Sequence, residues 1–448
     1  MVHMFRIGGT RLALDVESGS LHSLDEAAFS VLEKMGSPPE VWDESDPIMA
    51  ELRALHEAGQ LFTPGAEAQI YKHMEGRTPV IKALCLHMAH TCNLSCVYCF
   101  AGQGRYGEDD GGLMSLETGR KALDLLIDQS GSRKNLEVDF FGGEPMLNFD
   151  VVRELVAYGR GREKEAGKHF RFTLTTNGAL LDGDNIPFIN ETFDNIVLSL
   201  DGRPETNDRM RGAGTYEKLL PKIKALSEAR GKRSHYVRGT FTRHNLDFAA
   251  DVLHLADAGF NYISVEPVVG PQRSFGADVP YALGEADLPA LFAEYEKLAD
   301  ALLAREHEGR AVGFFHFDID LEGGPCIAKR VTGCGAGSEY LAVTPSGRLF
   351  PCHQFVGEGD FCLGDVDSGV TDTEKIKAFS QCHVAAKPAC TACWAKYYCG
   401  GGCMATAHCT NGDIMEPDRV SCALMKKRIE CALYMMAKRK LNTHTVGE

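Results

Sequence analysis

Apolar and polar residues alternate near the start of the chain. Leu12, Leu14 and Val16 share one face of the stretch "RLALDV", which is the two-residue period of a β-strand with one buried side. The turn sequence "ESGS" and a second short strand, "LHSL", complete a predicted hairpin. Two segments with the period of a helix follow, "DEAAFSVLEKMG" and "SDPIMAELRALHEAG". Residues 1–75 are therefore predicted to form a small winged-helix-like unit.

Strand-like and helix-like segments alternate between residues 80 and 313. Strand-like runs such as "IKALCLHM", "LEVDFF", "FRFTLTTNG" and "FNYISVEPVV" are separated by longer segments with helical period. Repeated strand–helix units of this kind favour parallel strands joined by right-handed crossovers. The pattern predicts an α/β fold, built either as a barrel or as an open sheet.

The pattern changes after residue 313. Glycine and cysteine become frequent, and long periodic segments are missing until a helix predicted over residues 424–440. A segment this irregular buries too little apolar surface to be stable alone, so metal clusters are expected to stabilise residues 314–448. The chain of 448 residues thus divides into three predicted domains, 1–75, 80–313 and 314–448.

The charge of the chain disfavours two classes of partner. Lysine and arginine (47) minus aspartate and glutamate (62) give a net charge of −15, whereas nucleic acids and anionic membranes attract basic surfaces. Neither an apolar signal segment nor a run long enough to span a bilayer occurs, so a cytoplasmic location is expected. Because the cytoplasm is reducing, the 16 cysteines are expected to be metal ligands rather than disulfides.

Three cysteines lie in the short loop "CNLSCVYCF", which follows a predicted strand. Cys92, Cys96 and Cys99 could bind zinc together with a distant fourth cysteine. The spacing argues against zinc, because zinc modules use paired Cys-x2–4-Cys knuckles and no second knuckle lies near this loop. Three cysteines suit three irons of a 4Fe–4S cube whose fourth iron stays free, and the aromatic Tyr98 fits beside such a cube.

This loop resembles the signature of the radical S-adenosylmethionine (SAM) enzymes. In that family the free iron binds the amino and carboxylate groups of SAM, so the resemblance implies that Cys92, Cys96 and Cys99 hold the catalytic cluster. The later "GGEP" resembles the family's motif for the methionine amino group, in which glycines permit close approach and Glu144 offers an acceptor for an ammonium. An ordinary strand-end turn is the alternative for that motif taken alone.

The resemblance extends to further polar residues at the ends of predicted strands. The positions it implies for SAM binding are Tyr98, Gly142, Gly143, Glu144, Pro145, Thr176, Asn177, Ser199, Asp201, Arg211 and Arg238. Either Arg211 or Arg238 would hold the methionine carboxylate, and a structural ion pair is the alternative for each. Glu266 is a further candidate at the mouth of the barrel.

The later cysteines resemble the SPASM domain, a twin-cluster extension of radical SAM enzymes that modify peptides. The resemblance assigns one 4Fe–4S cluster to Cys390, Cys393, Cys399 and Cys422. It assigns another to Cys334, Cys352 and Cys403, with Cys326 as a candidate fourth ligand. Without Cys326, one iron would stay open for a substrate thiolate. The other cysteines are expected to be core or surface thiols: Cys85, Cys362, Cys382, Cys409 and Cys431.

The order of the three units most resembles that of the thioether-forming maturases of six-cysteine (SCIFF) ribosomal peptides. The resemblance implies a partial (β/α)6 barrel, three 4Fe–4S clusters, SAM, and an N-terminal unit that binds the leader of a cysteine-rich precursor as an added strand. A 5′-deoxyadenosyl radical would remove hydrogen from the precursor, and a cysteine sulfur would bond to that carbon. An auxiliary cluster would accept the surplus electron, and ferredoxin or flavodoxin would serve as reductant.

Other functions stay open at this point. The nearest is an anaerobic sulfatase maturase, which oxidises serine or cysteine to formylglycine. That family has an acidic residue after the cysteine that corresponds to Cys352, whereas this chain has His353 and an added N-terminal unit. Epimerisation or carbon–carbon cross-linking would use the same radical. A non-catalytic iron–sulfur electron carrier or a zinc scaffold would explain the cysteines but not "GGEP". A structural cap or a nucleic-acid-binding winged helix is the alternative for residues 1–75.

Overall fold

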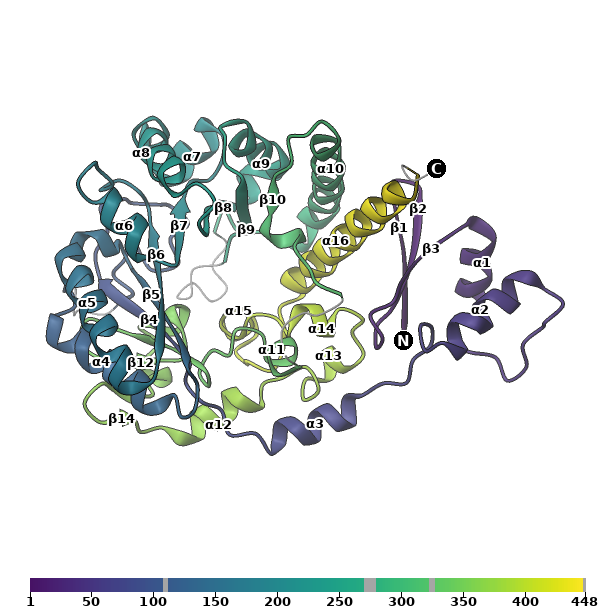
Figure 1. Cartoon of the computed structure of the whole chain (residues 1–448), viewed down its shortest axis with the longest axis horizontal. Coiled ribbons are helices and arrows are strands. Elements are labelled where there is room, and N and C mark those ends of the chain that lie inside the picture. Colours follow the sequence, from purple (N-terminus) through teal and green to yellow (C-terminus); the bar gives the residue numbers. More distant parts are fainter. Residues whose placement is uncertain (108–111, 270–278, 322–326, 446–448) are drawn as a thin grey trace.

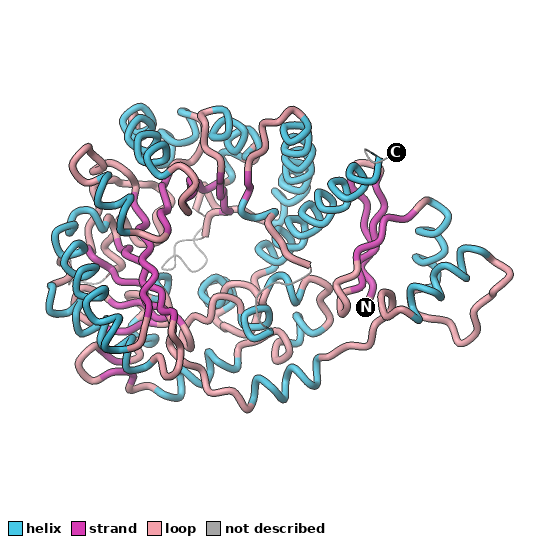
Figure 2. The backbone as a smooth tube through the Cα atoms, viewed as in Figure 1, coloured by secondary structure: helices cyan, strands magenta, loops and turns pink. Residues whose placement is uncertain are grey.

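The computed structural model describes residues 1–107, 112–269, 279–321 and 327–445. Within these residues the strands form two sheets, a small antiparallel sheet near the N-terminus and a large, mainly parallel one. Figure 2 shows the small sheet set apart at one end of the molecule. No helix of the described residues is both long and apolar enough to cross a membrane.

The N-terminal unit is a three-stranded antiparallel sheet with two helices on one face and a third helix that packs on the cysteine-rich region. Its strands are β1 (Val2–Ile7), β2 (Thr10–Asp15) and β3 (Leu21–Leu24), and its helices are α1 (Glu26–Met35), α2 (Pro47–Glu57) and α3 (Glu67–Glu75). The hairpin of β2 and β3 confirms the prediction, whereas β1 and α3 were not predicted. Both faces of β2 are buried, since Ala13 packs against α1 and α2 while Leu12 and Leu14 join the main core.

The large sheet begins after this unit and has the predicted parallel strands. They are β4 (Ala83–Ala89), β5 (Asn135–Gly142), β6 (His169–Thr176), β7 (Asn195–Ser199), β8 (His235–Phe241), β9 (Tyr262–Pro267) and β10 (Gly313–Phe314), each paired with the next. The helices between them are α4 (Leu116–Gln129), α5 (Phe149–Ala166), α6 (Ile186–Thr192), α7 (Pro204–Arg211), α8 (Thr215–Arg230), α9 (Phe248–Asp257) and α10 (Leu288–His307). The predicted alternation of strands and helices is thus confirmed.

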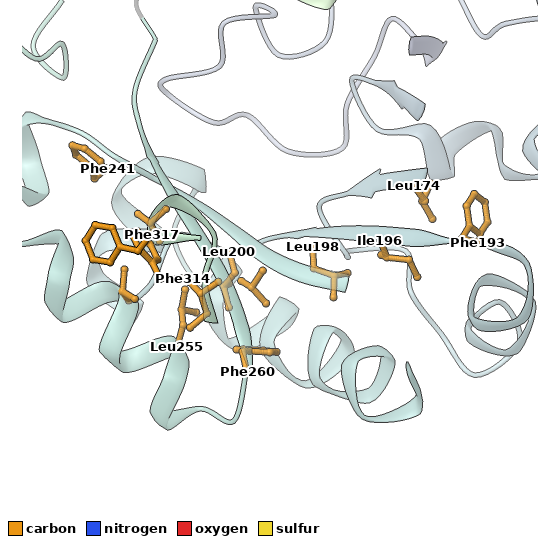
Figure 3. Close-up of a cluster of buried hydrophobic side chains, with 14 of the residues drawn as sticks. Leu174, Phe193, Ile196, Leu198, Leu200, Phe241, Leu255, Phe260, Phe314 and Phe317 are labelled. Atoms are coloured by element: carbon orange, nitrogen blue, oxygen red, sulfur yellow. The ribbon is translucent and has the colours of Figure 1, made fainter. Parts of the chain in front are cut away.

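Alternation along each strand divides the large sheet into a helix-covered face and an open face. In β7, Ile196 and Leu198 are fully buried, and Figure 3 shows them on the side where the helices lie, as it does Leu255 of α9. The intervening Asn195, Val197 and Ser199 instead line a cavity. Because successive side chains of a strand point to opposite faces, one strand serves both the core and the cavity.

The large sheet continues into the cysteine-rich region. Strand β11 (Tyr340–Val343) pairs in parallel with β4, and β12 (Arg348–Phe350), β13 (Gly364–Asp365) and β14 (Gly369–Val370) extend the sheet with antiparallel pairing. Hydrogen bonds of one sheet therefore cross the boundary predicted between residues 313 and 314. The helices of this region are α11 (Ile327–Thr332), α12 (Thr373–Gln381), α13 (Pro388–Thr391), α14 (Lys396–Cys399), α15 (Met404–Asn411) and α16 (Arg419–Thr445).

Helix α16 connects the two ends of the chain. It packs along α10 and against β1 and β3, and in Figure 1 it runs toward the small sheet. The ring of His3 in β1 stacks on Trp394 with ring centroids 3.7 Å apart, and its Nε2 lies 3.0 Å from Glu430 of α16. The N-terminal unit is therefore packed directly on the cysteine-rich region.

Candidate functional site

The loop after β4 and the loop after β5 are held together by backbone hydrogen bonds. The N–H of Gly143 donates to the carbonyl of Ala89 at 2.8 Å, and the N–H of Glu144 donates to that of Thr91 at 3.0 Å. A Cβ atom on Gly143 would lie 2.0 Å from the carbonyl oxygen of Thr91. Glycine is required there because the second loop touches the backbone that leads into Cys92.

The three-cysteine loop is fixed at both of its ends. Near its start, the side-chain amide of Asn177 donates to Asn93 at 2.7 Å and lies 3.7 Å from the sulfur of Cys92. Near its end, the N–H of Val97 donates to the carbonyl of Met210 at 2.7 Å. All three predicted ligands, Cys92, Cys96 and Cys99, line one cavity of about 510 Å³. Burial raises the pKa of Cys96 to about 11.

A buried carboxylate anchors the aromatic residue of this loop. The hydroxyl of Tyr98 donates to both oxygens of Asp201 at 2.9 and 2.8 Å, and Arg211 Nη2 lies 2.9 Å from the same carboxylate. Asp201 is fully buried and does not line the cavity. Arg211 does line it, and its Nε is buried without a hydrogen-bond partner among the described residues. That N–H is thus left to donate to a bound ligand.

Glu144 faces the same cavity from the end of β5. Its carboxylate accepts hydrogen bonds from the hydroxyl of Thr176 at 2.7 Å and from the N–H groups of Asn177 at 2.8 Å and Met146 at 3.1 Å. Burial raises the pKa of Glu144 to about 7, against the effect of these hydrogen bonds. A carboxylate has about four acceptor positions, so one stays available for a donor such as an ammonium.

Most of the remaining predicted SAM contacts lie on the cavity wall. Gly142, Gly143, Thr176, Asn177, Ser199 and Arg238 line it together with the residues above. Arg238 is paired with Glu266, which lines the cavity as well. Pro145 does not line it and instead begins the short 3-10 helix η1 (Pro145–Asn148). Like Asp201, Pro145 therefore supports the site from behind the wall.

The cysteines of the C-terminal region form two groups. Burial is the main cause of the raised pKa of Cys352. The neighbouring thiols of Cys403 and Cys334 raise it further. Burial raises the pKa of Cys422 to about 11, with further contributions from the other members of the second predicted set, Cys399, Cys390 and Cys393. Thiols affect one another in this way only at short range, so the structure brings together the members of each predicted set. Cys326 lies outside the described residues.

A glycine run separates the two groups. Gly400, Gly401 and Gly402 all have positive φ angles, between 70° and 90°. A Cβ atom on Gly400 would lie 2.8 Å from the Cα atom of Gly333. Only glycine adopts positive φ angles readily and also permits such a close backbone approach. The run therefore lets the chain place Cys399 in one group and Cys403 in the other.

The donors fit iron–sulfur clusters better than a single ion. The described residues contain no group of three His, Cys, Asp or Glu side chains that could hold one metal ion. In a cluster each thiolate binds a different iron, so its cysteines surround a volume instead of converging on a point. The free N–H of Arg211 and the remaining acceptor position of Glu144 also fit the carboxylate and ammonium groups of SAM. The residues present thus suit the predicted cofactors.

Several cavity residues were not predicted from the sequence. Asp139 of β5, Tyr236 of β8 and Tyr340 of β11 all line the cavity. So do His353 and Gln354, which directly follow Cys352. A signal for Asp139 was present in "LEVDFF", where Glu137 and Asp139 alternate with apolar residues and so lie on one face of the strand. Nothing in the sequence near Tyr340 indicated that its strand would pair with β4.

The family comparison matches the region of the parallel strands. The model of the Radical SAM superfamily matches residues 86–264. Among curated proteins, the radical SAM cyclopropyl synthase TigE of Paramaledivibacter caminithermalis is 22% identical over 77% of this chain and 72% of its own length. The subtilosin biosynthesis protein AlbA of Bacillus subtilis is 25% identical over 62% of this chain, which spans 56% of AlbA.

Solved structures share the fold over more of the chain. The structure of anSMEcpe with bound AdoMet and the Cp18Cys peptide aligns with a TM-score of 0.66 at 20% identity, covering 81% of this chain and 99% of that one. The structure of Streptococcus suis SuiB bound to its precursor peptide SuiA aligns with a TM-score of 0.55 at 15% identity, covering 94% of this chain and 98% of SuiB. At such identities the likeness concerns the fold.

Proposed function

Given its radical SAM region, we propose that this chain is a peptide maturase that forms thioether cross-links between a cysteine sulfur and a carbon of a precursor peptide. The precursor is a short cysteine-rich peptide with a leader, and the reductant is a protein such as ferredoxin or flavodoxin. Three 4Fe–4S clusters and SAM are the cofactors. The radical SAM enzyme TigE, the bacteriocin biosynthesis protein AlbA and SuiB, whose structure holds a precursor peptide, support a role in peptide modification by similarity at low identity.

One observation supports this proposal above all others. A single cavity is lined on one side by Cys92, Cys96 and Cys99 and on another by His353 and Gln354, the residues next to Cys352. A peptide segment inside it would lie between the site of radical formation and the first auxiliary group. An oxidative cross-link needs both, because a carbon must lose hydrogen and the closing bond releases one electron.

The roles of the chain's own residues follow from their positions. Cys92, Cys96 and Cys99 would hold the cluster that, when bound, supplies the electron for cleavage of SAM. Glu144 would accept from the methionine ammonium with its remaining acceptor position, and Arg211 would donate to the methionine carboxylate. Phe100 and Phe141 flank the imidazole of His353 with ring centroids 5.4 and 5.1 Å away. These two rings would exclude water from the space between the three-cysteine loop and the first auxiliary cysteines.

The N-terminal unit would bind the leader of the precursor. Strands β1 and β3 are the two outer strands of its sheet, and an extended peptide binds to such a strand through main-chain hydrogen bonds. The unit also contacts the cysteine-rich region through His3 and Trp394. A leader bound there would therefore bring the following core peptide close to the auxiliary cysteines.

A sulfatase maturase is the second candidate, favoured by the structural likeness to anSMEcpe. Two features argue for the thioether maturase. The first is that sulfatase maturases have an acidic residue at the position that His353 occupies in this chain. The alignment with anSMEcpe covers 81% of this chain, whereas that with SuiB covers 94%, so the SuiB fold accounts for more of the chain.

Mass spectrometry of the product tests this proposal. The anaerobically reconstituted protein is incubated with reductant, SAM and a short cysteine-rich peptide, chosen from reading frames that neighbour its gene. We expect 5′-deoxyadenosine and a peptide that has lost two hydrogens per bridge, with fragment ions that connect a cysteine to its partner residue. A formylglycine product would instead identify the sulfatase maturase, and an unchanged peptide without deoxyadenosine would identify an electron carrier.

A double variant separates the catalytic loop from the auxiliary groups. Cys96→Ala together with Cys99→Ala removes two ligands of one cluster and leaves both C-terminal sets intact. Deoxyadenosine should become undetectable, while iron bound by the auxiliary cysteines remains. Wild-type production of deoxyadenosine by this variant would contradict the assignment of the loop.

A further inference from the structure

Among the cavity carboxylates, Asp139 is distinguished by its surroundings. It lies in the middle of β5, three residues before Gly142, and lines the cavity between the three-cysteine loop and the cysteine-rich region. The hydroxyl of Thr175 donates to its Oδ1 at 3.2 Å. This is its only hydrogen bond within the described part of the chain, so Oδ2 is free to meet a molecule in the cavity.

The other cavity carboxylates are already occupied. Glu144 accepts three hydrogen bonds from the chain, and Glu266 is paired with Arg238. Glu137 lies two residues before Asp139 on the same strand and is exposed. Asp139 is therefore set apart from Glu144 and Glu266, because it has a single hydrogen bond and no cation in hydrogen-bonding contact within the described residues.

The surroundings of Asp139 place it near the first auxiliary group. Tyr340 of β11 interacts electrostatically with Asp139 and also with Cys352. The hydroxyl of Tyr340 lies 3.3 Å from Nδ1 of His353. A substrate group that contacts Oδ2 of Asp139 would thus lie on the side of the cavity where Cys352 is found.

We propose that Asp139 is the proton acceptor for the donor cysteine of the precursor. This inference rests on the proposed function and names a residue that acts in the step in which the carbon–sulfur bond forms. The carboxylate takes the proton of the cysteine thiol, which leaves a thiolate and a neutral carboxyl group. The sulfur then bonds to the carbon that has lost a hydrogen atom to the deoxyadenosyl radical. The surplus electron passes to an oxidised iron–sulfur cluster, and Asp139 releases its proton to water.

The chemical environment of Asp139 suits this role. Burial raises its pKa to about 7, while the hydrogen bond from Thr175 and the charge of Arg238 oppose the rise. A base whose pKa is near the working pH both accepts and releases a proton readily. The ionisable groups around it are Glu137 on the same strand, Cys85 of β4, Tyr340 of β11, Arg238 and Tyr236 of β8, and Tyr106.

The variant Asp139→Asn tests the role. Asparagine has nearly the same shape and still accepts a hydrogen bond from Thr175, but it cannot take a proton. We expect cross-linking to slow by about 100-fold or more, so that far more deoxyadenosine is formed per cross-link. With a precursor deuterated at the acceptor carbon, deuterium should still appear in deoxyadenosine. That result would locate the defect after hydrogen removal.

The pH dependence distinguishes a proton acceptor from a structural residue. A carboxyl with a pKa raised to about 7 is ionised above that pH, so the wild-type rate of cross-linking should rise as the pH increases through 7. Asp139→Asn should lose this rise, and Asp139→Glu should recover part of the rate with the rise retained. Difference infrared spectra near pH 7 should show a weaker protonated-carboxyl band in Asp139→Asn than in the wild type, because Glu144, whose pKa is also raised to about 7, contributes to the band in both proteins.

Glu165→Gln is the control, because it neutralises an exposed carboxylate that does not line the cavity. Its ratio of deoxyadenosine to cross-link should stay within about twofold of wild type. The inference is overturned if Asp139→Asn behaves like this control in rate and pH profile. If Asp139→Asn fails to bind clusters, the pH dependence of the wild-type protein is the test. A wild-type cross-linking rate that does not change through pH 7 overturns the inference. A wild type that makes deoxyadenosine but a different peptide product contradicts the proposed function instead.

Discussion

At the scale of single residues, the tightest constraint falls on Gly143. A Cβ atom there would lie 2.0 Å from the carbonyl oxygen of Thr91 and 3.1 Å from the N of Cys92, and neither backbone atom can rotate away. Gly143→Ala should therefore displace the cysteine loop and lower deoxyadenosine formation by about 100-fold, since ångström-scale misplacement has that effect on catalysis. Iron content and deoxyadenosine yield are the measurements.

Gly161 provides the control for this substitution. It lies inside α5, and a Cβ atom there would meet nothing within 4 Å. Gly161→Ala should keep full activity and raise the free energy of unfolding by about 0.5–1 kcal/mol, because alanine is the better helix former. Equal activity of both alanine variants would contradict the close approach of the two loops.

Motif residues could be predicted from the sequence, whereas their supporting contacts could not. Glu144 and Arg211 were predicted and line the cavity, since short motifs directly encode which side chains meet a ligand. The buried pairing of Asp201 with Tyr98 and Arg211 was not predicted. That pairing joins Tyr98 to a segment about a hundred residues later in the chain, and only the folded sheet brings the two together.

At the scale of elements, the junction of β4 and β11 depends on one buried carboxylate. Glu339 precedes β11 and is paired with Arg77 and Lys82, and its backbone carbonyl accepts from the N–H of Lys82 at 2.8 Å. Glu339→Gln should lower the free energy of unfolding by about 1–3 kcal/mol. This is less than for a fully buried pair, because the two cations are about a fifth exposed.

The effect of Glu339 should depend on pH in a defined direction. After the opposing effect of burial, hydrogen bonds from Lys82 and Arg77 hold its pKa below the usual value of 4.5. Its contribution is thus present above that pH and lost as the pH falls through the lower folded-state value. Urea unfolding of wild type and Glu339→Gln should differ at neutral pH and converge in acid. The exposed Glu165, changed to Gln, should have no effect beyond about 0.5 kcal/mol.

Elements with a long periodic pattern were predicted, and elements that depend on distant partners were missed. The two helical segments predicted in the N-terminal unit are close to the observed ranges of α1 and α2. Strand β1 was missed, although it pairs with all of β2. Strands β13 and β14 have two residues each, and segments this short carry no period. These two strands form because β11 pairs with β4 and each later strand pairs with the one before it.

At the scale of the whole molecule, the sequence pattern predicted the order of the units but not their contacts. Residues 1–75 were predicted as a separate unit, and the structure shows that unit packed on the cysteine-rich region. The side chain of Lys396, between Cys393 and Cys399, is 1% exposed and lies 2.9 Å from Glu17. No periodicity relates positions so far apart in the chain, so such a contact follows only from the fold.

Lys396 should therefore couple the N-terminal unit to the cysteine-rich region. Removing one partner of a buried ion pair lowers the free energy of unfolding by about 3–5 kcal/mol. The loss in Lys396→Met should lie near the lower end of this range, because the hydroxyl of Tyr397 still donates to Glu17 at 2.9 Å. We expect faster hydrogen exchange throughout residues 1–75 and a larger loss of cross-linking than of deoxyadenosine formation, because a loosened unit would no longer hold the leader over the cavity. The control Lys297→Met removes an exposed lysine 3.0 Å from Glu294 and should change neither. Unchanged exchange in Lys396→Met would show that the two regions are not coupled through this residue.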